Sequence, residues 1–331
     1  MDRRRVNDSL LWVQGLDVGF DTPHSNSPNV GVIEDLSFKL DRNRTLALVG
    51  ESGCGKSLTA LAILGLLPPF ARVTAGQMSF NGTDLTSLDD AQMTRLRGNR
   101  ISMIFQEPMS ALNPVFSVGW QIAESLRLHR QLSAAEAREL AVESLASVGI
   151  PDPTSRAADY PHQLSGGMRQ RVMIAMALAC DPDILIADEP TTALDVTIQA
   201  QIIDLILDLQ DRLGTSILFI SHDFGVVSHV ADEIAVMYAG RVVEHGSAAD
   251  IIDGAQHPYT RALLQTTPRI EHSLGVLPAI AGRVPAPDER GQGCAFQPRC
   301  ALASAACSSI RPEYNLIAGG HGAACHEITH A

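Results

Sequence analysis

The chain carries the octapeptide Gly50-Glu51-Ser52-Gly53-Cys54-Gly55-Lys56-Ser57, which matches the phosphate-binding loop G-x-x-x-x-G-K-[ST] at every fixed position. A short apolar run, Thr45–Val49, predicts a buried strand before it, and Leu58–Leu67 predicts a helix after it. In this order, backbone N–H groups converge on phosphate oxygens at the positive end of a helix dipole. Lys56 can reach the β- and γ-phosphates, and the Ser57 hydroxyl can bind Mg²⁺. The octapeptide therefore predicts a nucleotide site.

A second motif ends in two acidic residues. The apolar run Ile184–Ala187 predicts a strand, and Asp188 and Glu189 follow it. Asp188 at the strand end is placed to hold Mg²⁺ through water. Side chains alternate along a strand, so we expect Glu189 to point the other way and to act as general base or water-positioning group at the γ-phosphate. Alone, the pair would be typical of a solvated turn or helix cap; beside a phosphate loop it predicts hydrolysis.

A third motif lies between these two. Leu164-Ser165-Gly166-Gly167-Met168 opens an apolar helical run, Arg171–Ala179. A Ser-Gly-Gly helix start exposes several N–H donors and a hydroxyl, which favours a second anion site. The simpler interpretation is an N-cap and a turn.

The wider pattern predicts an α/β protein with a parallel sheet. Further buried-strand runs occur at Ile101–Phe105 and Ser216–Ile220. After Glu233–Met237 and a turn at Ala239–Gly240, a helical stretch that ends near Leu264 is expected. Leu11–Phe20 and Val32–Leu40 alternate well enough for an antiparallel β-region.

Two helices are expected in an all-helical insertion at about residues 108–160. Val118–Arg130 and Ser133–Val148 carry apolar residues at helical spacing, and Ser133 with Glu136 makes a capping box. Pro268–Pro298 is rich in Pro and Gly and is expected to be a linker.

Composition excludes several classes of protein. The chain has 331 residues, of which 45% are hydrophobic and 19% charged, so wholesale disorder is excluded. Its formal net charge of −12 argues against a protein that coats nucleic acid. No apolar run approaches the ~18 residues of a membrane helix, and no secretory signal pattern is present, so we expect a soluble chain.

Together the three motifs resemble the ATP-binding cassette (ABC) ATPases in order and distance. Gln106 matches that family's Q-loop glutamine, Ala193-Leu194-Asp195 its D-loop, and His222 its switch histidine. Met168 departs from the generic signature, which has Gln there. The resemblance implies a P-loop cassette with a RecA-like parallel core, an antiparallel β-subdomain and an α-helical insertion.

The resemblance also implies the roles of the site residues. Catalysis is assigned to Glu189, His222 and Lys56, and Mg²⁺ to Ser57, Gln106 and Asp188. Phe20 occupies the place of the aromatic residue that stacks on adenine. The implied contacts with ATP are Phe20, Gly50, Glu51, Ser52, Gly53, Cys54, Gly55, Lys56, Ser57, Leu58, Gln106 and Asp188. In the family two cassettes pair head to tail, so Ser165, Gly166, Gly167 and Met168 act on the ATP of the partner cassette, and Asp195 belongs to the D-loop.

Two further segments indicate a branch of the family. Residues 106–114 (QEPMSALNP) and 257–264 (HPYTRALL) resemble the dipeptide/oligopeptide importer ATPases, a branch that includes nickel importers. The expected partners are a homologous ATPase subunit, two membrane permeases and an extracytoplasmic substrate-binding protein, with the chain on the cytoplasmic face of the membrane and no nucleic acid bound. The alternatives are a nickel importer, a soluble ABC ATPase acting on DNA or ribosomes, and a P-loop kinase.

Four of the six cysteines lie close to the C-terminus. They are Cys294, Cys300, Cys307 and Cys325, and they lack the C-x-x-C knuckle typical of structural zinc. Four thiolates suit a [4Fe–4S] cluster, and the resemblance implies one, because the importer branch carries such a cluster in one of its two ATPase subunits, with similar Cys-rich tails. Zinc, with His321 or His326 as further ligands, and metal-free thiols are the alternatives. We expect an ATPase domain over residues 1–265 and a Cys-rich extension over 266–331.

Overall fold

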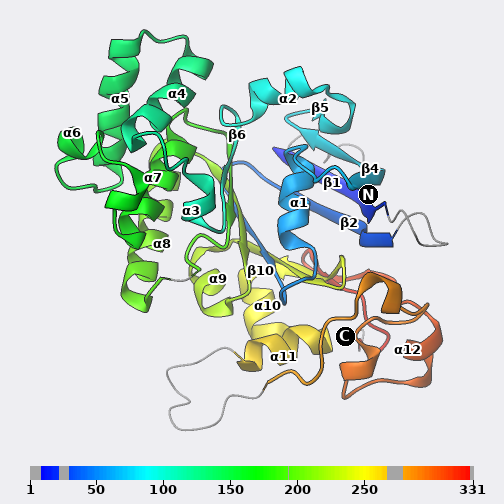
Figure 1. The fold of residues 1–331 in the computed structure, drawn as a ribbon. Helices are drawn as coiled ribbons and strands as arrows, with labels where there is room; N and C mark the ends of the chain where they lie inside the picture. The colour runs from blue at the N-terminus through cyan, green and yellow to red at the C-terminus, as the bar shows by residue number, and fades with distance from the viewer. Residues whose placement is uncertain (1–8, 22–29, 193, 267–278, 329–331) are drawn as a thin grey trace. The chain divides into compact units, whose positions relative to one another are not determined.

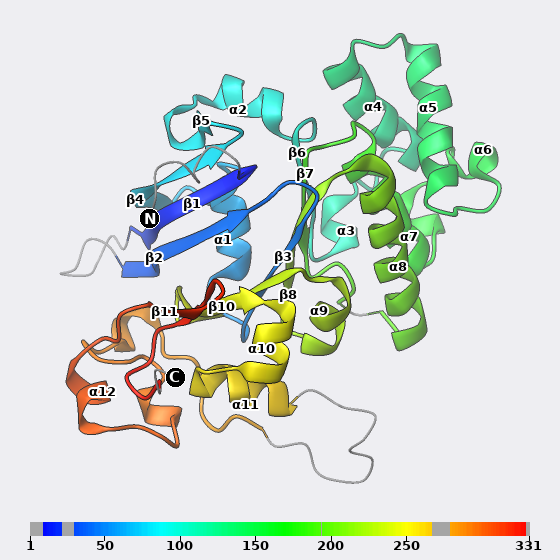
Figure 2. The same ribbon diagram turned by 180° about the vertical axis from the view of Figure 1, so that it is seen from behind.

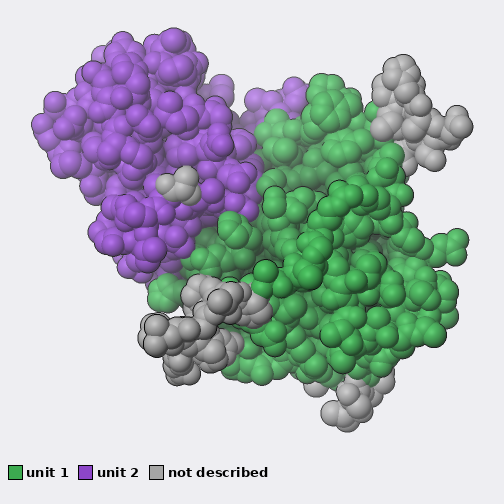
Figure 3. Space-filling model, turned by 60° about the horizontal axis from the view of Figure 1, so that its bottom comes forward, with its two compact units in different colours: residues 1–87, 219–331 green, residues 88–218 purple. Residues whose placement is uncertain are grey.

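The computed structural model describes residues 9–21, 30–192, 194–266 and 279–328 (Figure 1). Contacts divide the chain into two compact units (Figure 3). Unit 1 combines residues 1–87 with 219–331, and unit 2 comprises residues 88–218. The strand β8 (Ser216–Ser221) begins in unit 2 and ends in unit 1.

Unit 1 contains the antiparallel β-region expected from the sequence. Its order is β2-β1-β4-β5, with bounds β1 Leu11–Phe20, β2 Val30–Leu40, β4 Ala71–Phe80 and β5 Thr83–Asp84. The register of β1 shifts against both β2 and β4 between Val13 and Asp17. This irregularity explains why the buried residues of β1 change phase, from Leu11 and Val13 to Leu16 and Val18.

The second sheet of unit 1 carries the phosphate loop. The order β11-β12-β10-β9-β3 has the bounds β3 Thr45–Val49, β9 Glu233–Tyr238, β10 Arg241–Ser247, β11 Asn315–Ala318 and β12 His321–Ala323. β3 and β9 are parallel, with Leu46 paired with Glu233 and Val49 with Val236. Every residue of β3 is buried, as expected for a strand covered on both faces.

The helices of unit 1 are α1 (Lys56–Ile63), α9 (Phe224–Val230), α10 (Ala248–Gly254), α11 (Pro258–Thr266) and α12 (Ala305–Ser309). Figure 2 shows α10 and α11 below the yellow strand β10, and α12 in the C-terminal segment. The domain boundary expected at residue 265 falls at the end of α11 and remains a prediction.

Unit 2 contains the parallel strands β6 (Ile101–Ile104) and β7 (Ile184–Asp188), the start of β8 and a set of helices. β6 pairs in parallel with β7. The helices are α2 Asp90–Leu96, α3 Pro108–Ala111, α4 Val118–Arg130, α5 Ala134–Ser147, α6 Pro153–Arg156, α7 Gly166–Leu178 and α8 Val196–Leu213. α5 packs against α4 and α7. The predicted capping box of α5 is confirmed, because the Ser133 side chain accepts from the Glu136 N–H and Glu136 accepts from the Ser133 N–H.

One expectation is wrong for part of its range. Residues 268–278 of the expected linker lie outside the described residues, but 279–298 form short turns with side chains packed in unit 1. The Arg290 side chain is only 5% exposed and Phe296 is buried. Pro and Gly here bend the chain within a folded region, which a compositional rule for linkers does not distinguish.

Replacing Gly76 with Ala is expected to destabilise the antiparallel sheet by about 3 kcal/mol. Gly76 has a φ of +96°, and an added Cβ would lie 2.4 Å from the Gly15 carbonyl oxygen. Gly82→Ala is the matched control, since Gly82 has a similar φ of +78° but no heavy atom within 4 Å. The control should lose about 1 kcal/mol. Denaturant unfolding of the two variants measures the difference, and equal losses would contradict the proposed clash.

Candidate functional site

The phosphate loop leaves β3 at Gly50 and passes directly beside β9. An added Cβ at Gly50 would lie 2.2 Å from the Met237 carbonyl oxygen, so a side chain cannot be accommodated there. Gly55 precedes α1 with a φ of 109°, in the left-handed region that glycine adopts readily. The neighbouring strand and the turn into α1 therefore both require glycine in this loop.

Lys56 is buried, with only 5% of its surface exposed. Its Nζ donates to the Gly50 carbonyl oxygen at 2.7 Å and to the Glu51 carbonyl oxygen at 3.1 Å. The ammonium group therefore links the end of the loop to its beginning. Cys54 is fully buried, and its burial raises the pKa of the thiol. Ser57 and Leu58 are half-buried in the first turn of α1, and Ser52 and Gly53 are exposed.

In unit 2, the structure brings Gln106 and Glu189 together. Gln106 follows β6, and its Nε2 donates to Glu189 Oε2 at 3.0 Å. The Thr192 hydroxyl donates to the same oxygen at 2.9 Å. These two donors orient the carboxylate, and Thr192 was not singled out by the sequence.

Asp188 and Glu189 differ in backbone and burial. Asp188 is the last residue of β7 and is buried. Glu189 has a φ of +46°, so it leaves the strand in the left-handed region. The expectation that Glu189 continues the alternation of a strand is therefore wrong. Its side chain is directed by Gln106 and Thr192 instead.

The Ser-Gly-Gly segment begins α7 as expected. Ser165 is the N-cap, and its Oγ accepts from the Met168 N–H at 3.3 Å. An added Cβ at Gly166 would meet no heavy atom within 4 Å, whereas at Gly167 it would lie 3.2 Å from Ile198. The buried Gln170 on the same helix donates from Nε2 to the Pro190 carbonyl oxygen, next to Glu189.

The remaining motif residues are placed as follows. Asp195 is the N-cap of α8 and accepts from the Ile198 N–H at 2.9 Å; Ala193 lies outside the described residues. His222 directly follows β8 and is exposed. Phe20 ends β1, and its ring centroid lies 5.6 Å from that of Phe70, an exposed aromatic residue that no sequence motif indicates. The roles of these residues remain predictions.

The four C-terminal cysteines line one small pocket of unit 1, together with His326. The Cys294 N–H donates to the Cys307 carbonyl oxygen at 2.8 Å. Burial raises the pKa of the Cys294, Cys300 and Cys325 thiols.

Among the described residues, no group of three or more His, Cys, Asp or Glu side chains is arranged to hold a metal ion. The His321 ring bonds instead to Glu244 at 2.8 Å and does not line the cysteine pocket. His321 therefore does not support the zinc alternative. No helix in the described ranges is both long and apolar enough to cross a membrane.

A buried carboxylate anchors the HPYT segment. Glu244 is 0% exposed and accepts from the backbone N–H groups of Gln256 and His257 as well as from His321. His257 Nδ1 accepts from the Tyr259 N–H at 3.1 Å. Burial lowers the pKa of His257 to about 4. A neutral imidazole is therefore part of this fold at neutral pH.

Comparisons with known families match two parts of the chain. Residues 33–192 match the ABC transporter family, and residues 243–307 match the oligopeptide/dipeptide transporter C-terminal region.

Several curated relatives match almost the full length. A probable peptide ABC transporter ATP-binding protein, y4tR of Sinorhizobium fredii, is 50% identical over 96% of this chain and 95% of its own. The dipeptide transport ATP-binding protein DppD is 48% identical in Bacillus subtilis, over 96% of this chain and 94% of its own, and 45% identical in Escherichia coli, over 96% of both.

Among solved structures, the ATP-binding cassette MJ0796, described as a dimer in a post-hydrolysis state bound to ADP and Pi, has a TM-score of 0.64. It is 25% identical and covers 72% of this chain and 98% of its own.

Acid is expected to destabilise the protein through His257. The folded-state pKa of about 4 lies below the ordinary value of 6.5, so the unfolded chain binds the proton more readily. The free energy of unfolding should therefore be highest above pH 6.5 and should fall by up to about 3 kcal/mol as the pH drops to 4. His257→Asn, which keeps an acceptor for the Tyr259 N–H, should lose this part of the slope.

The control for this prediction is His162→Gln, at an exposed position of unit 2. Denaturant unfolding between pH 7 and pH 4 compares the three proteins. The assignment to His257 fails if His257→Asn keeps the wild-type slope.

Proposed function

The chain belongs to the family of peptide ABC transporter ATP-binding proteins, and on that premise we propose that it hydrolyses ATP to power the import of di- or oligopeptides. The observation that carries the peptide class is the match of residues 243–307 to the oligopeptide/dipeptide transporter C-terminal region. That range includes the His257–Leu264 segment, which is bonded into unit 1 through Glu244. The nickel importer is the alternative within the same branch.

In this proposal Lys56 and the loop N–H groups bind the β- and γ-phosphates. Mg²⁺ would be held by Ser57, Asp188 and Gln106 and would neutralise phosphate charge when bound. An amide that donates through Nε2 keeps its Oε1 as an oxygen ligand, so the bond from Gln106 to Glu189 is compatible with this role.

Glu189 is proposed to accept the proton of the attacking water. Two donors, Gln106 Nε2 and the Thr192 hydroxyl, fix its Oε2, and a fixed carboxylate loses less entropy on reaching the reactive geometry. His222 is proposed to contact the γ-phosphate.

A second cassette is part of the proposal. The N-terminus of α7 offers N–H donors at Gly166 and Gly167 and the Ser165 hydroxyl, which suit the γ-phosphate of an ATP held by a homologous partner subunit. The open space beside Gly166 supports a close approach of that kind.

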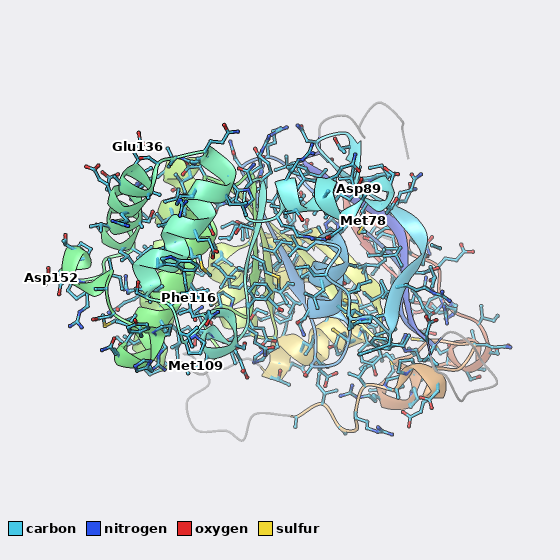
Figure 4. The ribbon with its side chains drawn as sticks, turned by 45° about the horizontal axis from the view of Figure 1, so that its top comes forward. Met78, Asp89, Met109, Phe116, Glu136 and Asp152 are labelled. Atoms are coloured by element: carbon cyan, nitrogen blue, oxygen red, sulfur yellow. The ribbon has the colours of Figure 1, made fainter. Side chains whose placement is uncertain are left out.

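Permease contact is proposed for an exposed apolar surface of unit 2. Phe116 and Trp120 stack with ring centroids 4.1 Å apart and are 39% and 42% exposed. Met109, labelled with Phe116 in Figure 4, is 56% exposed and Val115 69%. Exposed apolar side chains gathered in one segment favour a protein partner. We propose that one of the two permease subunits docks here and holds the chain at the cytoplasmic face of the membrane, with a substrate-binding protein on the other side.

A [4Fe–4S] cluster is proposed for the cysteine pocket. The four thiols line one cavity, and four cysteine thiolates are the usual ligand set of such a cluster. Bound iron would hold the sulfurs as thiolates and cross-link four positions of the extension. Zinc remains the alternative.

Replacing Glu189 with Gln is expected to lower the ATPase rate of the assembled transporter at least about 100-fold while ATP still binds. The isosteric amide keeps the shape of the site but cannot take the proton. Glu139→Gln, at an exposed carboxylate of α5, is the control and should retain the wild-type rate. Peptide-dependent ATPase of the complex reconstituted with its permeases measures both. An undiminished rate in Glu189→Gln would remove the residue from this role, and co-purification of ribosomes or DNA in place of permeases would refute the import function.

Anaerobically purified protein is expected to contain iron and acid-labile sulfide in equal amounts, and Cys300→Ser should lose most of both. Cys180→Ser, outside the extension, is the control and should retain them. Metal analysis and the visible absorption spectrum check this. Stoichiometric zinc without sulfide would overturn the cluster.

A further inference from the structure

The second residue of the phosphate loop is held by groups that follow it by about two hundred residues or more. The Glu51 N–H donates to the Tyr259 hydroxyl oxygen at 2.8 Å. The Glu51 carboxylate pairs with Arg299 through both oxygens, at 2.7 Å and 2.9 Å. Backbone and side chain of Glu51 are thus fixed independently by α11 and by the Cys-rich extension.

Arg299 is nearly buried, with 5% of its side chain exposed, and every N–H of its guanidinium group has an acceptor. Nε donates to the Ala281 carbonyl oxygen at 2.8 Å. NH1 donates to Glu51 and, at 3.4 Å, to the Tyr238 hydroxyl oxygen. NH2 donates to Glu51 and to the Ile280 carbonyl oxygen at 3.3 Å. Such a guanidinium group can take one orientation, so it fixes the position of its carboxylate partner.

Buried aromatic rings pack around the two groups that contact Glu51, the Tyr259 hydroxyl and the Arg299 guanidinium. Tyr238, Tyr259 and Phe296 form a cluster with ring centroids 4.5 to 5.3 Å apart. The Arg299 Cζ lies 5.8 Å from the Tyr238 centroid and 5.9 Å from that of Phe296. The hydroxyl of Tyr259 and the guanidinium of Arg299 are therefore presented to the loop by packed aromatic residues.

The negative charge of Glu51 links this arrangement to nucleotide binding. Glu51 is the acidic residue of a loop that binds a polyanion, and an uncompensated carboxylate there would repel phosphates. Arg299 takes up that carboxylate. Lys56 donates to the backbone carbonyl oxygens of Gly50 and Glu51, so the Glu51 carboxylate does not neutralise its positive charge.

We propose that Arg299 and Tyr259 are positioning residues for the phosphate loop and that the C-terminal extension thereby sets the affinity for ATP. Arg299 neutralises Glu51 and fixes its side chain, and Tyr259 fixes its backbone N–H. The Glu51 carbonyl oxygen then stays within reach of Lys56, with the ammonium group inside the loop. The inference concerns ATP binding and does not depend on the transported cargo.

The test measures binding of the non-hydrolysable analogue AMP-PNP with Mg²⁺ to the full chain by calorimetric titration. Arg299→Gln should weaken binding about tenfold, and Tyr259→Phe about threefold. The double variant Arg299→Gln/Glu51→Gln should bind about threefold more tightly than Arg299→Gln alone, because it removes the uncompensated charge. Arg283→Gln is the matched control; this exposed arginine of the extension pairs with Glu289 and should leave affinity unchanged within about twofold.

Thermal midpoints without nucleotide are recorded for each variant, so that loss of stability is separated from loss of affinity. Should Arg299→Gln not fold, Arg299→Lys takes its place, since a lysine keeps the charge but loses the paired geometry and should weaken binding in the same direction. Unchanged affinity in a folded Arg299 variant overturns the proposal, even where the thermal midpoint falls. A double variant that binds no more tightly than Arg299→Gln also overturns it.

Discussion

The parallel pairing of β3 with β9 determines where the phosphate loop can lie. Val49 is paired with Val236, so the next residue, Gly50, passes beside the Met237 carbonyl oxygen with no room for a side chain. The Gly240 N–H then donates to the Cys54 carbonyl oxygen at 3.0 Å, so the turn after β9 also supports the loop. A loop supported on two sides by one neighbouring strand and its turn presents its N–H groups in a fixed arrangement, as phosphate recognition requires.

The buried carboxylate of Glu244, on β10, binds His321 at the start of β12 and so links the C-terminal residues to the sheet that carries the phosphate loop. Removing a carboxylate from water is costly unless donors replace the water, and here backbone and histidine donors do so. Glu244 lies on β10 and pairs in register with Ala323 of β12. Its bond to the His257 N–H fixes the start of α11, where Tyr259 reaches the phosphate loop. A continuous set of hydrogen bonds therefore joins the sheet, α11 and Glu51.

Sequence patterns predicted the structure correctly where an element is determined by residues close to one another in the chain. The bounds of β3 were predicted correctly because Thr45–Val49 is an apolar run that ends at the loop glycine. The capping box of α5 involves residues three positions apart, so its pattern can be read directly. The helical stretch expected after Gly240 is wrong at its start, where Arg241–Ser247 forms the strand β10. This segment contains charged residues, and the burial of Glu244 depends on His321, far along the chain. The positive φ of Glu189 was missed for a similar reason: a side chain from the end of β6 orients its carboxylate. No sequence pattern indicated the role of Arg299, because its partner, Glu51, lies far away in the sequence, in the phosphate loop.

A chain with a net charge of −12 binds a polyanion only if local charges outweigh the overall repulsion. Screening confines the field of distant surface carboxylates to about 8 Å in physiological salt, so the residues beside the loop decide. Within that range the structure separates the two opposite charges of the loop. Lys56 is bonded to neutral carbonyl groups, whereas the Glu51 carboxylate pairs with Arg299 of the extension. If Glu51 paired with Lys56, the carboxylate would neutralise the lysine and weaken its attraction for phosphate. In the arrangement that we propose, the extension contributes to nucleotide binding because Arg299, and not Lys56, pairs with the Glu51 carboxylate. This electrostatic role needs no contact between the extension and ATP.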